Sequence, residues 1–229
     1  MKKIIKLLAV IVLLESAVCA WTQDYKTHEV SNAPAFTAIE VSGGDIDVFF
    51  SQGESHAFSI NGPAKLVKAT KIKIKENTLF INYNAHLFTG DDDDLKVYVT
   101  APQINRITVS GEADFESKNG FQGNELTVKT HQNGEVSMKN VSVNQINIDA
   151  KGSSSVDFDY VQAGKIRISS SDRAEVEISG QTGQMEVVKK GMFAEIDTKE
   201  LNITNPSGVN SSNNGVGQVA KDGGVEFVF

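Results

Sequence analysis

The segment Ile146–Tyr160, INIDAKGSSSVDFDY, sets the pattern for the second half of this chain. It has apolar residues at alternate positions, then a turn rich in Gly and Ser, then two further alternating apolar residues. Alternation of this kind turns one set of side chains inward and is typical of β-strands. The segment therefore predicts two short strands joined by a turn.

The same pattern recurs along the chain in segments that start at Ile107, Leu126, Ile166, Met185 and Leu201. With Ile146 included, successive starts lie 19, 20, 20, 19 and 16 residues apart. A period near 20 is too short for a pair of helices, and the leucine-rich repeat signature is missing. We expect a parallel β-helix in which each repeat forms one coil, with equivalent side chains about 4.8 Å apart.

Equivalent apolar residues should then form four inward columns. The first two are Ile107, Leu126, Ile146, Ile166, Met185 and Leu201, and Val109, Val128, Ile148, Ile168, Val187 and Ile203. The other two are Ala113, Val136, Val156, Val176 and Glu195 or Ala194, and Phe115, Met138, Phe158, Ile178 and Ile196. We expect a one-residue slip in the Met185 coil, with a bulge or altered turn at Gly191–Phe193. Gly111, Gly134, Gly152 and Gly191 fall in one shared turn, where positive φ favours glycine.

The remaining parts of the chain have their own signals. Residues 1–20 have a cationic start, a short apolar run and small residues at Val18–Ala20, which predicts a secretory signal peptide cleaved after Ala20. Residues 21–35 read as a linker, 36–103 as entry strands that cap the first coil, and 104–204 as coils. Residues 205–229 read as a loop and a terminal strand that closes the far end. Lys75–Thr78 is expected to form a hairpin loop.

Cys19 leaves a second form of export open, in which the chain becomes a lipoprotein acylated at this residue. Under cleavage after Ala20, Lys+Arg falls from 22 to 19 and Asp+Glu from 29 to 28, so the net charge becomes −9. No cysteine then remains for a disulfide. An acidic exported chain is a poor partner for nucleic acid, because binding phosphates needs a basic surface. Contact with a membrane is expected only through a lipid anchor at Cys19.

Carboxylates recur beside the inward residues of each coil and predict an acidic ladder on one side of the stack. Its members are Asp114, Glu116, Glu135, Asp157, Asp159, Glu175, Glu177 and Asp197, with Asp45 and Asp47 in the same relative place. Like charges on neighbouring strands destabilise a sheet. Bound Ca²⁺, a basic partner, or solvent with Lys118, Lys139 and Lys199 nearby are the three ways to offset them.

Other candidates for chemistry are weaker. Asp91–Asp94 lacks the spaced pattern of a calcium loop and reads as a solvated loop. His28, His56, His86 and His131 lack the close spacing of a zinc site and have no serine motif beside them. No catalytic, cofactor-binding or metal-binding residue is therefore assigned.

Two segments carry a resemblance to a known family. FTAIEVSGGDIDVFFSQG, from Phe36, and LKVYVTAPQINRITVSG, from Leu95, resemble the bacterial family called putative auto-transporter adhesin, head GIN domain. The resemblance covers roughly Phe36–Thr204, although the Gly-Ser-Gly turns of the family are replaced here by sequences such as QNG and KGSSS. It implies a right-handed β-helix and a role in envelope or surface adhesion, with no catalytic residues.

Three functions remain open on the sequence. The first is a non-catalytic envelope or surface module, similar to an adhesin, that binds a glycan or a protein. The second is a β-helix lyase or hydrolase acting on glycans, and the third is a structural spacer. Carboxylate pairs in every coil look like a repeated pattern and not like a single catalytic site, which favours the first function.

Overall fold

The computed structural model describes residues 25–83, 95–205, 217–221 and 224–228. These residues form an all-β fold that contains a 15-stranded mixed sheet and a separate two-stranded sheet. Within this part of the chain, the one helix is the short α1 (Ala64–Ala69), and no helix is long and apolar enough to cross a membrane. The predicted signal peptide, Cys19, His86 and Asp91–Asp94 lie outside the described residues.

The N-terminal strands are mostly antiparallel. β1 (Tyr25–Val30) pairs with β3 (Ala57–Pro63), and β3 pairs with β6 (Lys96–Ala101). β4 (Lys71–Lys75) and β5 (Thr78–Tyr83) form the expected hairpin, whose two turn residues, Glu76 and Asn77, have φ of 50° and 57°. β1 lies in the segment for which the sequence predicted only a linker.

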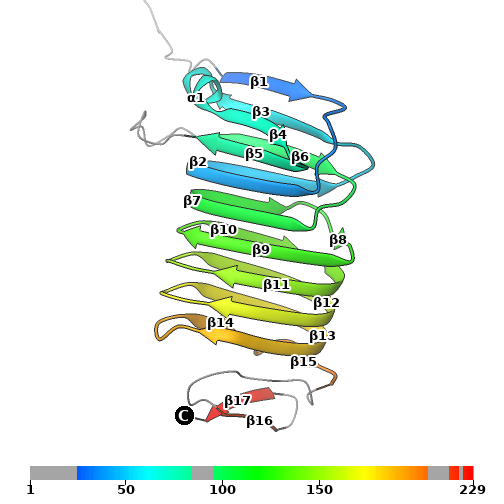
Figure 1. Cartoon of the computed structure of the whole chain (residues 1–229), viewed down its shortest axis with the longest axis vertical. Helices are drawn as coiled ribbons and strands as arrows, with labels where there is room; N and C mark the ends of the chain where they lie inside the picture. The colour runs from blue at the N-terminus through cyan, green and yellow to red at the C-terminus, as the bar shows by residue number, and fades with distance from the viewer. Residues whose placement is uncertain (1–24, 84–94, 206–216, 222–223, 229) are drawn as a thin grey trace, which may run out of the picture.

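A stack of parallel strands follows (Figure 1). Its long strands are β2 (Ala38–Gln52), β7 (Arg106–Ser117), β9 (Glu125–Gln132), β11 (Val141–Ala150), β12 (Ser155–Ser170) and β13 (Glu175–Lys190). Its short strands are β8 (Phe121–Gln122), β10 (Glu135–Lys139), β14 (Glu195–Asp197) and β15 (Leu201–Ile203). Because β2 pairs in parallel with β7, the stack begins at Ala38, earlier than the predicted start of the coils.

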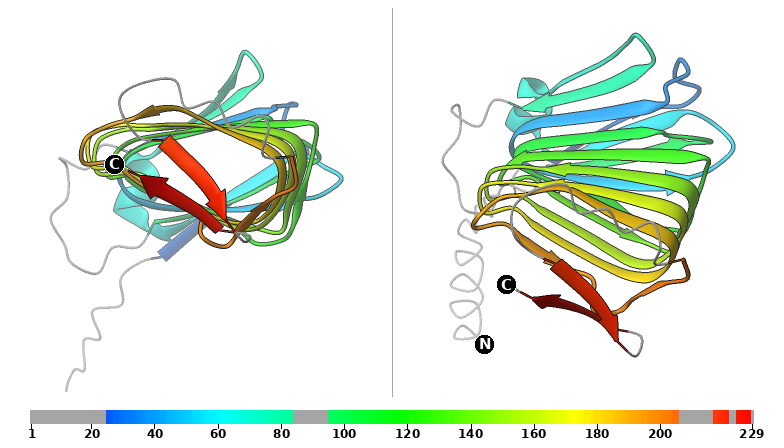
Figure 2. Two further views of the ribbon diagram at one scale, coloured as in Figure 1. Left: turned by 90° about the horizontal axis from the view of Figure 1, so that it is seen from below. Right: turned by 60° about the horizontal axis from the view of Figure 1, so that its bottom comes forward.

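The stack has three faces, each made of paired segments, and seen from below its coils superpose into a flattened ring (Figure 2). The first face runs through residues 38–43, 106–111, 125–132, 145–150, 165–170 and 184–190. The second runs through 46–50, 113–117, 135–139, 155–159, 175–178 and 195–197. The third runs through 121–122, 141–143, 161–163, 180–182 and 201–203.

The register confirms the centre of the predicted columns and corrects both ends. Ile146 pairs with Ile166, and Ile166 pairs with Met185, as expected. At the first coil, however, Ile107 pairs with Val128 instead of Leu126, and Phe115 pairs with Val136. At the last coil, Leu201 pairs with Gly180 instead of Met185, and Ile196 pairs with Val176 instead of Ile178. The errors at Phe115, Ile107 and Ile196 are shifts by two residues, which keep the same side chains inside. Leu201 and Ile203 differ, because their strand lies on the third face and not below Met185 on the first.

The expected slip in the Met185 coil is present, but its position differs from the prediction. The register between β12 and β13 shifts once between Phe158 and Val161, where β13 has one residue fewer, and again just after Ile168, where β13 has the extra residue Val188. The turn Gly191–Ala194 keeps the hydrogen bond from Ala194 N–H to Gly191 O, equivalent to the bond from Ala174 N–H to Ser171 O above it. The irregularity is therefore a bulge at Val188 and not in the turn.

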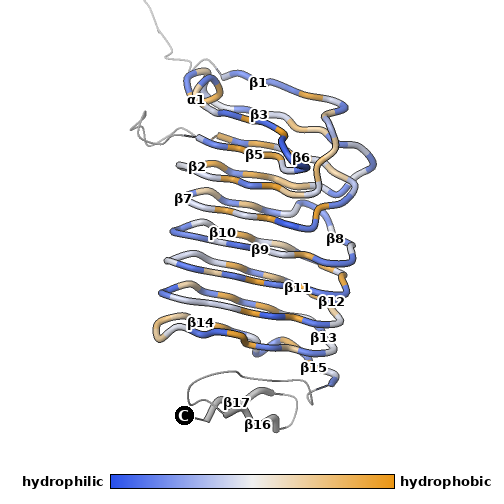
Figure 3. The backbone as a smooth tube through the Cα atoms, viewed as in Figure 1, coloured by the Kyte–Doolittle hydropathy of each residue, from blue (hydrophilic) through white to orange (hydrophobic). Residues whose placement is uncertain are grey.

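Apolar side chains from all three faces fill one continuous core. Figure 3 shows the matching alternation of hydrophobic and hydrophilic residues along the strands. Phe50 stacks on Phe115 at a centroid distance of 6.0 Å and meets Phe121 edge-on at 6.3 Å. These aromatic rings are almost completely buried, and their burial contributes much of the stabilisation of the first coils.

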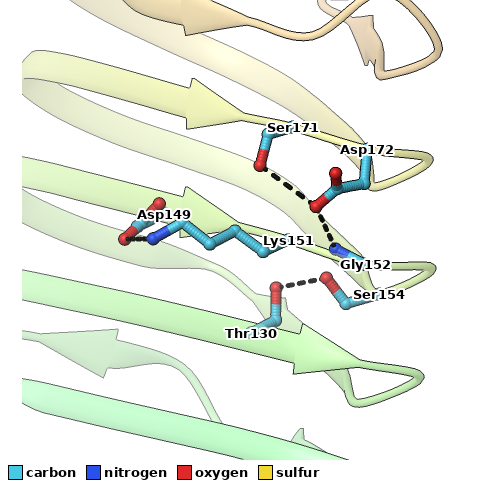
Figure 4. Close-up of polar contacts among 7 residues, drawn as sticks. All are labelled: Thr130, Asp149, Lys151, Gly152, Ser154, Ser171 and Asp172. Atoms are coloured by element: carbon cyan, nitrogen blue, oxygen red, sulfur yellow. Dashed lines mark hydrogen bonds and ion pairs between the residues drawn. The ribbon is translucent and has the colours of Figure 1, made fainter.

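The turn between the first and second faces explains only part of the glycine pattern. Gly111 and Gly152 have φ of 88° and 84°, whereas Gln132 and Asp172 adopt similar angles, 61° and 62°, at the equivalent positions. Gly134 occupies another position of the same turn without positive φ. Here Asp172 Oδ2 accepts hydrogen bonds from Gly152 N–H and Ser171 Oγ, which ties one turn to the next (Figure 4).

We predict that Gly111→Ala lowers the free energy of unfolding by at least about 2 kcal/mol. A Cβ at this position would lie 1.9 Å from Gly43 O, and the backbone has a φ that alanine avoids. Urea denaturation followed by circular dichroism measures the change. Gly120→Ala is the control, because its Cβ would meet nothing closer than 3.3 Å, and it should change stability by less than about 0.5 kcal/mol. Equal effects of the two substitutions would contradict the prediction.

Candidate functional site: an acidic face

The structure places the predicted carboxylates on the second face of the stack. We call this surface the acidic face. It comprises Asp45, Asp47, Asp114, Glu116, Glu135, Asp157, Asp159, Glu175, Glu177, Glu195 and Asp197, all on strands β2, β7, β10, β12, β13 and β14. Their apolar neighbours in the strands point inward and are buried, so these side chains point outward.

The carboxylates fall into two groups along the face. In the first group, Asp47 pairs with Asp114 and Asp114 pairs with Glu135. In the second, Asp157 pairs with Glu177 and Glu177 pairs with Asp197, while Glu175 pairs with Glu195 beside them. Side chains that are directly opposite on neighbouring strands lie close together, so each group concentrates negative charge.

Two serines separate the groups, and the sequence did not predict this break. Ser137 pairs with both Glu116 and Asp157, and Ser155 pairs with both Glu135 and Glu175. The ladder is therefore interrupted in both columns at β10 and β12. The average repeat pattern does not reveal this interruption, because Ser137 and Ser155 lie in different coils and in different columns of the face.

Lysines lie at the margin of the face and neutralise only part of it. Lys96 on β6 lies directly opposite Asp47 in the strand register. Lys118 Nζ is 2.7 Å from Glu116 Oε2, and Lys199 Nζ is 2.8 Å from Asp197 Oδ2. Lys139 Nζ is 3.5 Å from Asp159 Oδ2. Among the described residues, Asp114, Glu135, Glu175 and Glu195 form no ion pair.

The other two faces differ in charge. On the first face, acidic and basic side chains pair, as in Lys151 with Asp149 at 2.8 Å and Lys165 with Glu186 at 3.1 Å. The outward residues of the third face are uncharged; they are Gln122, Ser142, Gln162, Gln181 and Asn202. The excess negative charge of this part of the chain is thus confined to the second face.

A shallow hollow of ≈ 350 Å³ lies in the first group of carboxylates. The outward residues that line it are Asp47, Phe49, Asp114, Glu116, Glu135 and Ser137. Phe49 packs against Tyr98, which is 46% exposed, at a centroid distance of 5.3 Å, and Lys118 Nζ lies 4.0 Å from the Phe49 ring centroid. Carboxylates next to an aromatic ring suit a cationic group. Phe49 has the same outward parity as Asp45 and Asp47, which is the sequence signal for this ring.

Asp114 is the carboxyl group most affected by its surroundings. Partial loss of solvation, followed by the charges of Glu135, Asp47 and Asp45, raises its pKa from 3.8 to about 6. The carboxyl is therefore partly protonated in mildly acidic solution. A cation bound in the hollow would favour the ionised form and reverse this shift.

In the second group, the pKa values move in both directions. Loss of solvation and then Asp159 raise the pKa of Asp157, and the charge of Asp157 is the main cause that raises the pKa of Glu177. Asp197 differs, because hydrogen bonds from Lys199 lower its pKa. The charge of Lys139 offsets only part of the rise in the pKa of Asp157, whereas Asp197 at the edge of the group is fully paired with Lys199.

The acidic face is not arranged as a metal centre. Among the described residues, no three His, Cys, Asp or Glu side chains are grouped so that they could hold a metal ion. His28, His56 and His131 lie apart, on β1, in the loop before β3 and on β9. His56 Nε2 lies 3.0 Å from Phe36 O, and its ring meets that of Phe36 edge-on, so this histidine has a structural contact.

The conspicuous Gln52 of the N-terminal motif also has a structural role. Its Nε2 donates hydrogen bonds to Pro102 O and Gln122 O, both at 2.9 Å, and its Oε1 accepts one from Gln122 N–H. Asn119 bonds to both backbone groups of Gln52. Gln52 thus ties the end of β2 to β8, where the stack gains its third face.

Residues 35–220 match the family model described as putative auto-transporter adhesin, head GIN domain. The chain belongs to this family. The resemblance seen in the sequence is thereby confirmed. No curated protein matches the chain in sequence.

Solved structures share the fold at low sequence identity. A putative adhesin from Parabacteroides distasonis has 18% identity and a TM-score of 0.71, over 80% of this chain and 77% of that one. A putative adhesin from Parabacteroides merdae has 19% identity and a TM-score of 0.68, with coverages of 79% and 75%. A putative lipid binding protein from Parabacteroides distasonis has 16% identity and a TM-score of 0.65, with coverages of 77% and 74%. These similarities establish a shared fold.

The raised pKa of Asp114 predicts that the free energy of unfolding falls as the pH rises. The folded protein holds this proton more tightly than the unfolded chain, so stability is lost as the pH rises from 3.8 to about 6. Asp114→Asn should raise the unfolding free energy at neutral pH by about 1 kcal/mol, after allowance for solvent screening, and leave it unchanged below about pH 3.5. Thermal melts across this range measure it. Asp197→Asn should act in the opposite direction at neutral pH, because a lowered pKa stabilises the ionised form. A stabilising Asp197→Asn, or a neutral Asp114→Asn, would contradict the assignment.

Calcium should leave the melting temperature unchanged. The described carboxylates spread along the face and do not converge on one point as the oxygen ligands of Ca²⁺ do. Melting curves with millimolar CaCl₂ and with EDTA test this expectation. A rise of several degrees in calcium would show that the ladder, or carboxylates outside the described residues, binds the ion.

Proposed function

We propose that this protein is a non-catalytic, exported binding module of the cell envelope, and that it holds a macromolecular partner against the acidic face. The observation that carries the proposal is the stacking of carboxylates in register on one face, where lysines pair with only some of them. Such an arrangement costs stability in the free protein, and a cationic partner would relieve that cost.

The chemistry of the face favours a partner that presents several cationic groups. The Asp114 and Glu135 side of the hollow suits one ammonium or guanidinium group, because Lys118 already lies over the Phe49 ring. The Glu175–Glu195 pair suits another. A basic segment of another envelope protein meets these requirements. A glycan with free amino groups is the alternative.

Membership of the family supports a role at the surface, and the N-terminal residues support export. Residues 1–20 have the composition of a signal peptide, and Cys19 offers a lipid anchor in the alternative processing. We further propose that the parallel stack is a right-handed β-helix. Support comes from its in-register parallel pairing and from the strong right-handed preference of parallel crossovers.

The proposal predicts that an oligo-arginine peptide binds the protein and that binding weakens with salt. The triple variant Glu175→Gln, Glu177→Gln and Glu195→Gln should lower the affinity at least about tenfold in isothermal titration calorimetry. A matched control removes three carboxylates from the first face through Glu40→Gln, Glu125→Gln and Asp149→Asn. Equal losses in the two triple variants would mean that only net charge matters, and the acidic face would lose its assignment.

One observation favours a second candidate, a glycan-cleaving enzyme. A carboxyl group with a pKa of about 6, as in Asp114, can serve as a general acid beside Glu135. The hollow is shallow and lies on a flat face without cleft walls, which argues against this function. Incubation with a panel of envelope glycans tests it, because released reducing ends that disappear in Asp114→Asn would establish catalysis.

A further inference from the structure

The third face of the stack is uncharged, and its polar side chains form few contacts within the protein. One outward residue of each coil lies in register along it, from β8 to β15 (Figure 1). In the part of the chain that the structure describes, the side chains of Ser142, Gln162, Gln181 and Asn202 make no hydrogen bond. An amide offers both donors and an acceptor. The face therefore presents a row of available hydrogen-bonding groups with a repeat of about 4.8 Å.

An exposed aromatic side chain, Tyr160, lies at the corner where the second face meets the third. It is 69% exposed, and neither its ring nor its hydroxyl group contacts a partner among the described residues. Its backbone has a φ of 58°, a left-handed conformation that large side chains avoid. The equivalent residue of the preceding coil is Asn140, with a φ of 55°, and asparagine tolerates this conformation. Tyrosine at this position therefore costs stability that asparagine would not.

An irregularity of the strand register leaves Tyr160 outside the ladder. Between Phe158 and Val161, β12 has two residues where β13 has one, Ser179. The N–H of Tyr160 donates a hydrogen bond to Ser179 Oγ at 3.1 Å in place of a ladder bond. Bulges of this kind redirect a side chain and are frequent beside functional sites. Because strain and exposure coincide at a side chain that packs against nothing described, Tyr160 is better explained by a ligand than by folding.

A second shallow hollow lies at the opposite edge of the third face, in the coil of Tyr160 and the next coil. Its volume is ≈ 340 Å³, and the residues that line it include Gln162, Gly164, Gln181 and Gly183. The close approach of the coils requires these glycines, since a Cβ at Gly183 would lie 2.6 Å from Gly164 O. A hollow at the lower end of the size range of small-ligand sites fits one small ring. Tyr160, Gln162 and the hollow thus follow one another across the face.

The charges around the third face select neither a cation nor an anion. Within two residues of its segments, the charged residues are Lys139, Asp159, Lys165, Lys199 and Glu200. Each of the three lysines is paired with a carboxylate, at 3.5, 3.1 and 2.8 Å. The ligand that fits this face is therefore uncharged.

The size of the third face excludes a stable protein interface. Five coils about 4.8 Å apart, each about three residues wide, give a surface of about 20 Å by 10 Å. This area of about 200 Å² is far below the roughly 800 Å² that each partner contributes to a standard protein complex. A narrow chain rich in hydroxyl groups fits better. Its hydroxyls match the amides, and the apolar side of a sugar ring matches the flat face of a tyrosine.

We propose that the third face, together with Tyr160, binds an uncharged glycan. One sugar ring stacks on Tyr160, and hydroxyl groups of the following ring bond to Gln162 and Gln181 as the glycan crosses towards the hollow. This site is separate from the acidic face, which lies on the second face of the stack. The protein can therefore hold a cationic partner and a glycan at the same time.

Affinity electrophoresis tests the proposal. The chain beginning at Trp21, which keeps every described residue, is run through native gels that each contain one uncharged polysaccharide: a glucan, a mannan, a xylan or a galactan. At least one of them should retard the protein relative to a gel without polysaccharide. The dissociation constant for that polysaccharide should not change with salt, because no ion pair forms.

Two variants locate the site. Tyr160→Asn copies Asn140 and should raise the dissociation constant at least about tenfold. It should also keep or raise the melting temperature, because it relieves the backbone strain, so the loss of binding cannot be attributed to unfolding. Gln162→Ala with Gln181→Ala should weaken binding by a similar factor, because it removes both amides beside the hollow.

Controls separate this site from the acidic face. Tyr98→Ser removes an exposed ring from another part of the surface and should leave retardation unchanged. The triple variant Glu175→Gln, Glu177→Gln and Glu195→Gln should also leave it unchanged. Retardation by none of the four polysaccharides, or retardation that survives Tyr160→Asn, would overturn the proposal. So would a fall in the sedimentation coefficient of the free protein in Tyr160→Asn, because the ring would then contact a second copy.

Discussion

Backbone hydrogen bonding between parallel coils, in fixed register, is the constraint on which the rest of this structure depends. It aligns Ile146, Ile166 and Met185 in one inward column, and it equally aligns the outward residues between them. The register of the inward side chains therefore also fixes the register of the outward side chains. Every substitution on a face is therefore placed directly above and below its equivalents in the neighbouring coils.

The acidic face follows from this constraint. Asp157, Glu177 and Asp197 would avoid one another in a more flexible chain, but their strands hold them in register. Burial of the core on the opposite side of the same strands offsets the repulsion, because Val156, Phe158, Val176 and Ile178 are almost completely buried. The stability from such a core offsets the repulsion between like charges on the surface. Surfaces with concentrated charge are common where proteins bind partners.

Much of this arrangement could be read from the sequence. Alternation and a period near 20 were enough to predict the strands, the turn, the parallel pairing of the central coils and the side on which the carboxylates lie. Register at the ends could not be predicted, because Ile107 is equally inward whether it pairs with Leu126 or Val128. The first coil is 21 residues long in that register, from 107 to 128, and only the structure reveals its longer path. The hollow beside Phe49 was not predicted either, because it is lined by β2, β7 and β10 together, and the register between these strands could not be predicted.

The two irregularities of β13 have a consequence for how such proteins change length. One residue is missing near Ser179 and one is added at Val188. After Val188 the residues of β13 again pair with β12 in the register that held before Ser179. An uncompensated deletion would move charged side chains into the interior of every later segment of that coil. Insertions and deletions in this architecture should therefore occur as nearby pairs of opposite sign, or else in the loops at the corners.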